Sequence, residues 1–338
     1  MMSRNTIFFS LAALFLLMTG CHNNNPKQRD IRKNPETSFM GQDYPGSEPE
    51  LFGPGIISTR RNERDFALSP DRKEVFYSYA LPGFGLSVII RMHHDGAFWS
   101  PPVVAWFSGA FNDLEPAFSP DGSTLFFVSR RPLDVNDSTN DWNIWKTDKK
   151  DGKWTAPLAL KEPINGEGNE FYPSVADNGN LYFTAENKND TQGGEDIYMA
   201  RWTGSGYAQP LNLGTGVNSK HPEFNAFVAP DESYLIFSSW GREDGLGGGD
   251  LYISFRNGDG TWQEAVHMGQ GINSDKLDYC PFVAAPGNLL FFTSQRLEAA
   301  ITDGMKKTLD EVMGLEDQPM NGLGDIYWVA FDPAQWKQ

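Results

Sequence analysis

Two columns of charged residues recur along this chain at a nearly constant spacing, and they are the residues best suited to chemistry. Acids occur 50 to 57 residues apart, at Glu63, Asp113, Glu170, Glu223 and Asp278. Bases accompany four of them, at Arg131, Lys188, Arg242 and Arg296. If the columns adjoin, they form ion pairs that fasten loops, which is the favoured interpretation because the pattern repeats. Unpaired, the nine residues would form a binding rim whose carboxylates take a cation or a sugar.

A second motif looks at first like a ligand loop. Gly193-Gly-Glu-Asp-Ile-Tyr returns as Asp250-Leu-Tyr, Asp325-Ile-Tyr, Asn143-Ile-Trp and, in degraded form, Ser87-Val-Ile. An aromatic follows each copy after eleven or twelve residues, at Phe98, Trp154, Tyr207, Trp262 and Trp336. A single site does not need equivalent copies, so Asp196, Asp250 and Asp325 are interpreted as scaffold residues that bond backbone amides of the adjacent loop.

Other chemical signals are weak. His93, His94, His221 and His267 lack metal-ligand spacing. The oxygen-rich run from Asp134 to Asp141 lacks the spacing and the glycine of an EF-hand, so a polar loop is preferred over a calcium site. The sequence contains no nucleophile elbow, phosphate loop or Cys-His pairing. Neither a metal nor a cofactor is expected.

The elements that position these residues follow from the repeat. Each copy has an apolar-polar stretch ending in a turn such as Ser119-Pro-Asp-Gly, then a β-branched and aromatic run, a variable loop, the Asp-Ile-Tyr strand and a last short strand. Four antiparallel strands in a repeat of about 50 residues are typical of a propeller blade. The sequence therefore predicts an all-β propeller with five blades.

The Ser-Pro-Asp-Gly turn, the Leu125-Phe-Phe strand and Asp196-Ile-Tyr resemble the WD40-like repeats of TolB-type β-propellers. The resemblance covers residues 50–338. It implies the fold, and it leaves function open because such propellers host binding and catalysis alike.

The ends of the chain predict how the ring closes. The fifth copy stops at Gln338 without a final strand, while Gly53-Pro-Gly-Ile-Ile-Ser stands unattached before the first copy. That segment is expected to complete blade five and so remove an exposed edge. Six blades, the alternative, would need a further copy of the repeat that the sequence does not contain.

Blade five carries an insertion. Asp250 and Asp325 are 75 residues apart, where the other blades need 53 to 56. Ile301, Met305, Leu309 and Val312 or Met313 recur at helical spacing, which predicts one short helix that starts near Thr302 or Asp303 and ends at Gly314. It is expected either to brace blade five or to cover the channel mouth, because all the long loops (130–142, 186–195, 241–249 and 295–324) share one face of the ring, called here the loop-bearing face.

The N-terminus predicts export. An apolar run from Ile7 to Met18 follows Arg4 and ends in Met18-Thr19-Gly20-Cys21, which resembles a bacterial lipoprotein signal. Residues 1–20 are expected to be the signal peptide, Cys21 the lipidated residue, 21–48 a flexible tether and 49–338 the propeller. This predicts a lipid anchor in the cell envelope, on the outer membrane, with no disulfide because only Cys280 remains.

Composition limits the partners. The formal net charge is −16 and no basic run occurs, which argues against nucleic acid. Two functions stay open. The preferred one is a non-enzymatic scaffold that binds a protein or glycan partner on the loop-bearing face. The alternative is a carbohydrate-active enzyme, a glycosidase or lyase, whose signature would be acids that one blade holds and the others lack.

Overall fold

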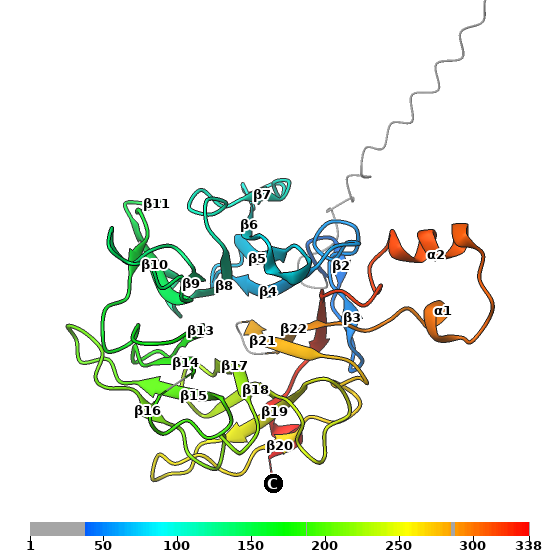
Figure 1. The fold of residues 1–338 in the computed structure, drawn as a ribbon. Helices are drawn as coiled ribbons and strands as arrows, with labels where there is room; N and C mark the ends of the chain where they lie inside the picture. Colours follow the sequence, from blue (N-terminus) through cyan, green and yellow to red (C-terminus); the bar gives the residue numbers. More distant parts are fainter. Residues whose placement is uncertain (1–37, 187, 285–287, 338) are drawn as a thin grey trace, which may run out of the picture.

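Each repeat folds into one antiparallel sheet, and the five sheets form a ring (Figure 1). The computed structural model describes residues 38–186, 188–284 and 288–337. In each blade the first strand is innermost, and the innermost strands of neighbouring blades contact one another around the whole ring. The expected five-bladed propeller is confirmed.

The strand bounds are as follows. Blade one comprises β4 (Glu63–Leu68), β5 (Glu74–Ala80), β6 (Ser87–His93) and β7 (Val103–Val104). Blade two comprises β8 (Asp113–Phe118), β9 (Thr124–Ser129), β10 (Asn143–Lys150), β11 (Lys153–Trp154) and β12 (Leu158–Ala159). Blade three comprises β13 (Glu170–Val175), β14 (Leu181–Glu186), β15 (Glu195–Ala200) and β16 (Leu211–Asn212). Blade four comprises β17 (Glu223–Val228), β18 (Tyr234–Ser239), β19 (Asp250–Phe255) and β20 (Val266–His267). Blade five comprises β21 (Asp278–Ala284), β22 (Leu289–Ser294), β23 (Asp325–Ala330) and β3 (Glu50–Leu51).

The apolar runs of the second strands form because both faces of every sheet are covered by a neighbouring blade. In β9, Phe127 packs with Phe76 of blade one, while Phe126 and Val128 pack with Phe183 of blade three. Successive side chains of a strand point to opposite faces, so a continuous apolar run serves both interfaces. Burying one such side chain stabilises the fold by about 2–3 kcal/mol.

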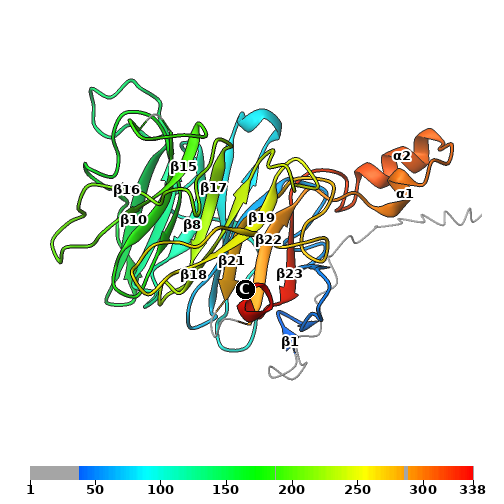
Figure 2. The ribbon, with the colours of Figure 1, turned by 90° about the horizontal axis from the view of Figure 1, so that it is seen from below.

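Turns of the Ser-Pro-Asp-Gly type lie on the face opposite the long loops, called here the turn face (Figure 2). In blade two, Ser119 donates its hydroxyl to Asp121 at 2.6 Å, and the Gly122 amide donates to the Ser119 carbonyl at 2.8 Å. Gly122 has φ +70°, a conformation that favours glycine.

The N-terminal strand closes the ring, as expected. β3 pairs with β23, with Leu51 opposite Tyr327 and Glu50 opposite Trp328. Ser58 then caps the contact, because its hydroxyl donates to the Ile326 carbonyl at 3.1 Å and accepts from the Ile326 amide at 3.0 Å. The paired strand is thus Glu50–Leu51, and the Gly53–Ser58 segment that was expected to pair is the turn behind it.

Residues 38–48, expected to belong to the tether, pack on the ring. β1 (Ser38–Phe39) pairs with β2 (Gln42–Asp43), and the Phe39 ring stacks on Phe52 with centroids 5.9 Å apart. The Arg72 guanidinium lies over the other side of this cluster, 4.8 Å from the Phe39 ring centroid. The expected signal peptide, Cys21 and the rest of the tether lie outside the described residues.

The insertion in blade five is helical, but it forms two helices, α1 (Ala299–Thr302) and α2 (Leu309–Glu316), where one was predicted, and Gly314 lies inside α2 and does not end it. The second helix begins later than predicted, because Gly304 turns the chain at φ +71° and Thr308 with Glu311 forms a capping box. The insertion extends sideways from the ring and does not cover the channel (Figures 1 and 2). It contacts the ring where Arg60 pairs with Asp317. Among the described residues, no helix is long and apolar enough to cross a membrane.

Candidate active site

A bend in every innermost strand aims one residue at the channel. The strand register shifts two residues after each of the five acids, as in a β-bulge. The residue at that point has a left-handed φ of 49° to 59° in all five blades. These five, called here the channel residues, are Asp65, Glu115, Tyr172, Asn225 and Cys280. The backbone device repeats in every blade, but the five side chains differ, so the chemical information lies in the side chains.

The channel residues contact one another and block the middle of the channel. The Cys280 thiol donates to Asp65 Oδ1 at 2.8 Å, and Asn225 Nδ2 donates to Glu115 Oε1 at 3.2 Å. The Tyr172 amide donates to Glu115 Oε2 at 2.7 Å. All five residues are buried. They form a polar plug whose two carboxylates come from neighbouring blades.

Arg64 lies between this plug and the loop-bearing mouth. Its Nε is 2.6 Å from Asp65 Oδ1, and its Nη2 is 2.9 Å from Glu115 Oε1. The guanidinium also stacks over the rings of Tyr279 and Phe84, at 5.0 and 5.8 Å from their centroids. One cation thus binds both channel carboxylates and two aromatic rings, which fixes it in place.

Two carboxyl groups of the plug, Asp65 and Glu115, face the single guanidinium of Arg64. Burial and the charge of Asp65 together raise the pKa of Glu115 to about 7, against the opposite effect of Arg64. Burial also raises the pKa of the Cys280 thiol well above its usual value. Glu115 can therefore hold a proton near neutral pH, and Cys280 remains a thiol.

Blade three adds a pair of carboxylates at the mouth that was not predicted as a site, although Glu195 belongs to the Gly193-Gly-Glu-Asp-Ile-Tyr motif. Glu186 and Glu195 are directly opposite each other on β14 and β15, and both are half-buried. Asn169 Nδ2 donates to Glu186 Oε2 at 2.6 Å. Burial raises the pKa of Glu195 to about 7, and the charge of Glu186 raises it as well, whereas Arg64 lowers it. Glu195 can therefore hold a proton near neutral pH, and Arg64 lies within electrostatic range of it.

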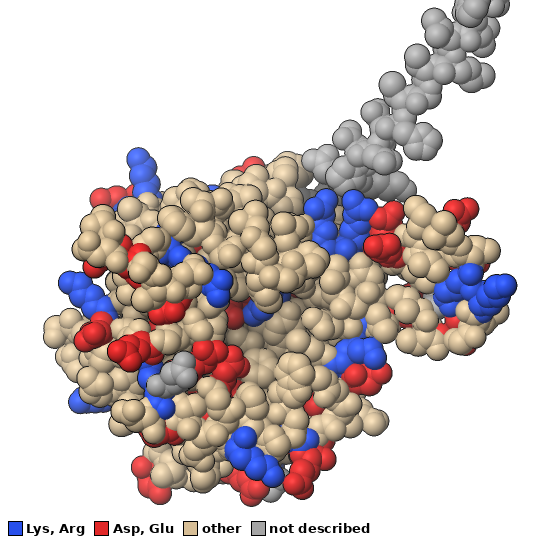
Figure 3. All heavy atoms as spheres, viewed as in Figure 1, with Lys and Arg blue, Asp and Glu red and all other residues tan. Residues whose placement is uncertain are grey.

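The other blades lack this pair. The positions that match Glu186 and Glu195, counted from the same strand register, hold Ala80 and Ser87, Arg130 and Trp142, Trp240 and Gly249, and Gln295 and Gly324. Blade three thus holds two acids where no other blade holds one. Figure 3 looks onto the loop-bearing face, where acidic and basic side chains lie around the centre of the ring.

The five repeated acids are placed differently from an open rim. All five are buried. Four form ion pairs: Asp113 with Arg131 at 2.7 Å, Glu170 with Lys188 at 2.7 Å, Glu223 with Arg242 at 2.8 Å and Asp278 with Arg296 at 3.3 Å. Glu63 has no such base and accepts from the Thr59 amide and hydroxyl at 3.1 and 2.6 Å. In place of a rim of free carboxylates, the structure has closed pairs that fasten the loops.

The Asp-Ile-Tyr aspartates also hold loops. Asp196 accepts from the amides of Gln192 and Gly193 at 3.0 Å each. Asp250 accepts from the Leu246 amide, and Asp325 from the Met320 amide. In blade one the matching strand is Val88-Ile-Ile, one residue later than the sequence alignment, because Tyr79 lies opposite Val88.

The repeated tryptophans pack at blade boundaries and outer edges. Trp154 stacks on Trp106, Trp262 packs edge-on to Tyr182, and Trp336 stacks on Phe331 in a 3₁₀ turn, η2 (Pro333–Trp336). Among the described residues, no group of three or more His, Cys, Asp or Glu side chains could hold a metal ion.

Comparisons with known proteins support the fold. No protein-family model matches the chain, and no curated protein sequence matches it. A structure described as a glycoside hydrolase is 7% identical, with 83% of this chain and 92% of that chain covered, at a TM-score of 0.51. A thermostable family-43 glycoside hydrolase is 11% identical, with 83% of this chain and 93% of that chain covered, at a TM-score of 0.49. TolB from Acinetobacter baumannii is 12% identical over 81% of this chain, at a TM-score of 0.44, and this chain spans only 55% of its length.

These comparisons correct the preferred functional expectation. The similar structure with a TM-score of 0.51 is described as a glycoside hydrolase, so the fold is one that an enzyme uses. The expectation of a non-enzymatic scaffold is corrected on this finding, and its alternative, a carbohydrate-active enzyme, is taken up as a proposal below. At 7% to 13% identity, however, these structures share only the fold with this chain. Which residues act must be argued from the geometry of this molecule.

Proposed function

We propose that this protein is a glycoside hydrolase that acts at the loop-bearing mouth of the central channel. The observation that carries the proposal is the carboxylate pair of blade three, Glu186 opposite Glu195. Acids that one blade holds and the others lack are the asymmetry that distinguishes an active site from a structural repeat. The rim acids cannot serve, because ion pairs and loop amides already bind them.

The two glutamates have the properties that glycoside hydrolysis requires. Directly opposed residues of paired strands point to the same face with Cβ atoms about 5 Å apart, so both carboxyl groups can reach one bound sugar, as the two carboxyl groups of a glycosidase must. Glu195, whose pKa is about 7, holds a proton and is suited to protonate the leaving oxygen. Glu186 accepts a hydrogen bond from Asn169 and is suited to attack the anomeric carbon as a carboxylate.

The test is hydrolysis of glycosides by the purified chain. A panel of aryl glycosides and plant and bacterial polysaccharides is incubated with it, and released sugar is measured. Glu195→Gln and Glu186→Gln should each lower kcat by about a hundredfold or more, because each removes one half of the acid–nucleophile pair. Glu243→Gln, an exposed acid in a loop of blade four, is the matched control and should hydrolyse like the parent.

Two results count against the proposal. The first is a substrate that both glutamine variants hydrolyse at the parent rate. The second is no sugar release from any member of the panel by the folded parent chain.

We also propose that the protein is a lipoprotein of a bacterial envelope, on the outer membrane. Support comes from the apolar run before Met18-Thr19-Gly20-Cys21. Sixteen residues lie between Cys21 and Ser38, where the described chain begins. That length spans at most about 60 Å, so a lipid on Cys21 would keep the ring close to the membrane.

A further inference from the structure

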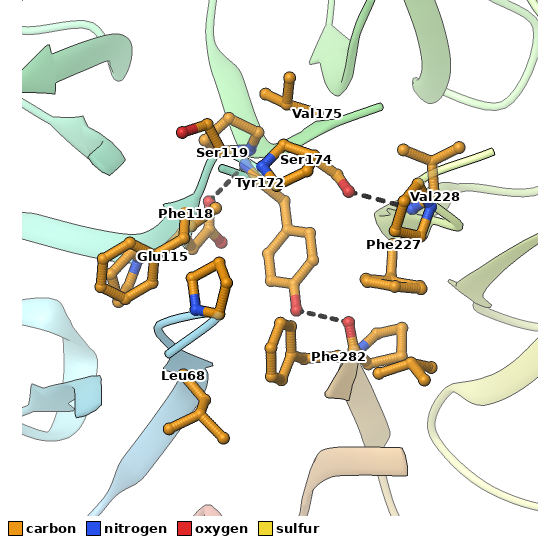
Figure 4. A pocket seen from close by; sticks show the side chains of 18 of the residues that line it. Leu68, Glu115, Phe118, Ser119, Tyr172, Ser174, Val175, Phe227, Val228 and Phe282 are labelled. Carbon is orange, nitrogen blue, oxygen red and sulfur yellow. Dashed lines mark hydrogen bonds between the residues drawn. The ribbon is translucent and has the colours of Figure 1, made fainter. Parts of the chain in front are cut away.

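The channel has a second opening, on the turn face, that the proposed hydrolase chemistry does not use. There the innermost strands enclose a hollow of about 330 Å³ below the polar plug, called here the funnel (Figure 4). One apolar residue of each innermost strand, five positions after the rim acid, lines it: Leu68, Phe118, Val175, Val228 and Val283. Its volume is within the range of small-molecule sites.

The funnel is suited to an apolar group. Phe118, Val175, Phe227 and Phe282 line it, and all four stay half-exposed although they are apolar. Two polar groups at its wall are already engaged: the Tyr172 hydroxyl donates to the Pro281 carbonyl at 2.9 Å, and Ser174 Oγ accepts from the Val228 amide at 3.0 Å (Figure 4). An entering alkyl chain would cover apolar surface without stripping water from an unsatisfied donor.

A wider groove of about 830 Å³ lies between blades two and three and differs in character. Blade two contributes Lys146 and Lys161, and blade three contributes Trp202 and Tyr207. The Trp202 side chain is 40% exposed and packs edge-on to Tyr207, with centroids 5.0 Å apart. An exposed indole beside charged side chains offers a flat face to a sugar ring and polar partners to its hydroxyl groups.

The groove exists because blade three has glycine where blade four has glutamate. In blade four, Glu232 fills the matching space, accepting from Asn180 Nδ2 and the Tyr182 hydroxyl at 2.8 Å each and pairing with Arg256. In blade three the matching residue is Gly179, and a Cβ there would lie 3.0 Å from the Trp202 ring. Because Gly179 has no side chain, Trp202 can lie directly against its backbone, and no side chain from this turn extends into the groove.

The funnel and the groove are continuous, because Ser119, Pro120, Val175 and Asp177 line both. We propose that together they bind an amphiphile with one alkyl chain and a saccharide head group, the chain in the funnel and the head against Trp202. This site is on the face opposite the carboxylate pair and does not depend on the proposed hydrolysis.

The test uses n-octyl β-maltoside below its micelle concentration, titrated by calorimetry into the full chain carrying Cys21→Ser, so that no N-terminal acyl chain competes. We expect saturable binding. Maltose, which lacks the chain, and n-octylphosphocholine, which lacks the sugar, should each bind about tenfold more weakly or worse. Val175→Trp should abolish binding, because it fills the junction of funnel and groove.

Trp202→Ala should weaken octyl maltoside about tenfold and leave octylphosphocholine unchanged. Trp240→Ala, which removes an indole that is 56% exposed in the loop after β18, is the matched control and should bind like the parent. Parent-like affinity in Trp202→Ala overturns the head-group assignment, and parent-like affinity in a folded Val175→Trp overturns the site. Should Val175→Trp not fold, Trp202→Ala and the comparison of the three ligands decide. Val175→Trp should hydrolyse glycosides like the parent, so failure here and failure of the proposed hydrolysis are distinguishable.

Discussion

At the scale of single residues, burial and partners separate acids that look alike in sequence. Glu223 and Glu195 are both glutamates beside the loops of the same face. Glu223 is fully buried against Arg242 and the Ser219 amide. Glu195 is only half-buried, and its nearest charged neighbour is another acid. The first therefore stabilises a loop, and the second has a proton to give.

The raised pKa of Glu195 predicts a pH dependence of stability. An unfolded glutamate titrates near 4.5 and Glu195 in the fold near 7. Between those values the native state binds more protons than the unfolded chain, so the free energy of unfolding falls as pH rises through this window. Glu195→Gln removes this loss. Urea unfolding should show the variant gaining stability relative to the parent from pH 5 to pH 8. If the difference in unfolding free energy between variant and parent stays the same across this range, the raised pKa is contradicted.

Glu223→Gln should destabilise the fold by about 2 kcal/mol or more, because it leaves Arg242 without its buried carboxylate. The control is Glu243→Gln, which breaks an exposed pair with Lys220 and should cost less than about 0.5 kcal/mol. Denaturant melts of the two variants measure the difference. Equal costs would mean that the Glu223–Arg242 pair is as well solvated as a surface pair.

The rim acids could be predicted from the sequence because an acidic residue repeats in every blade. The channel residues could not be predicted, because their side-chain types differ from blade to blade. Asp65, Glu115, Tyr172, Asn225 and Cys280 share a backbone conformation and a position but not a side-chain type. Their constant position, two residues after each rim acid, was the one feature of the sequence that could have located them. The Glu186–Glu195 pair is harder to find, because its two members meet only when β14 and β15 adopt their register.

At the scale of elements, the third strands of blades two to five begin beside one polar side chain that lies outside the strand. Asn165, Asn218 and Asn273 each accept from the backbone amide of an Ile or Leu in that strand. In blade five Ser58 does the same across 268 residues of chain. The repeat Ile-Asn-Gly or Val-Asn-Ser could have located this cap in sequence. The closing strand was misplaced by a few residues because Glu50–Leu51 is too short and polar to stand out.

Ser58→Ala should destabilise the propeller by about 1–3 kcal/mol, because the Ile326 amide and carbonyl lose their shared partner in a buried place. Ser47→Ala, at an exposed serine of the same segment, is the control and should leave the melting temperature unchanged. Equal melting temperatures of the parent and Ser58→Ala would show that the Ser58 hydrogen bonds do not stabilise ring closure.

The blade-five insertion should be dispensable for the ring. Met305, Leu309, Val312 and Met313 are all exposed, so the helices contribute little packing to the propeller. Replacing residues 299–314 with a short Gly-Ser linker should shift the melting temperature by no more than about 3 °C. A large drop would mean that the apolar side chains do pack on the ring in solution. Helical spacing predicted a helix in this insertion, but it did not indicate that Met305 lies between two helices or that the helices project away from the ring.

At the scale of the whole molecule, blade number and order followed from the sequence because every blade repeats the same turn and strands. The residues of the proposed active site could not be predicted in this way, because they lie at the few positions where the blades differ. The proposed anchor is tested at this scale. Cys21→Ser should move the protein from the membrane fraction to the soluble fraction of the producing cells, as followed by immunoblot. Parent protein that is already soluble would contradict the anchor.

The contact between Ser58 and Ile326 also sets an order of events during synthesis. Blade five needs β3 and Ser58 together with β23, so no ring can close until the chain has been synthesised through β23. Until then β21, β22 and β23 lack their outer strand, and the first blade lacks a neighbour on one side. Closing so long a loop is entropically slow, and an open sheet edge invites pairing with other chains. Ring closure is therefore the folding step at which this protein is most prone to aggregate. A chain truncated before residue 326 should be unable to close the ring.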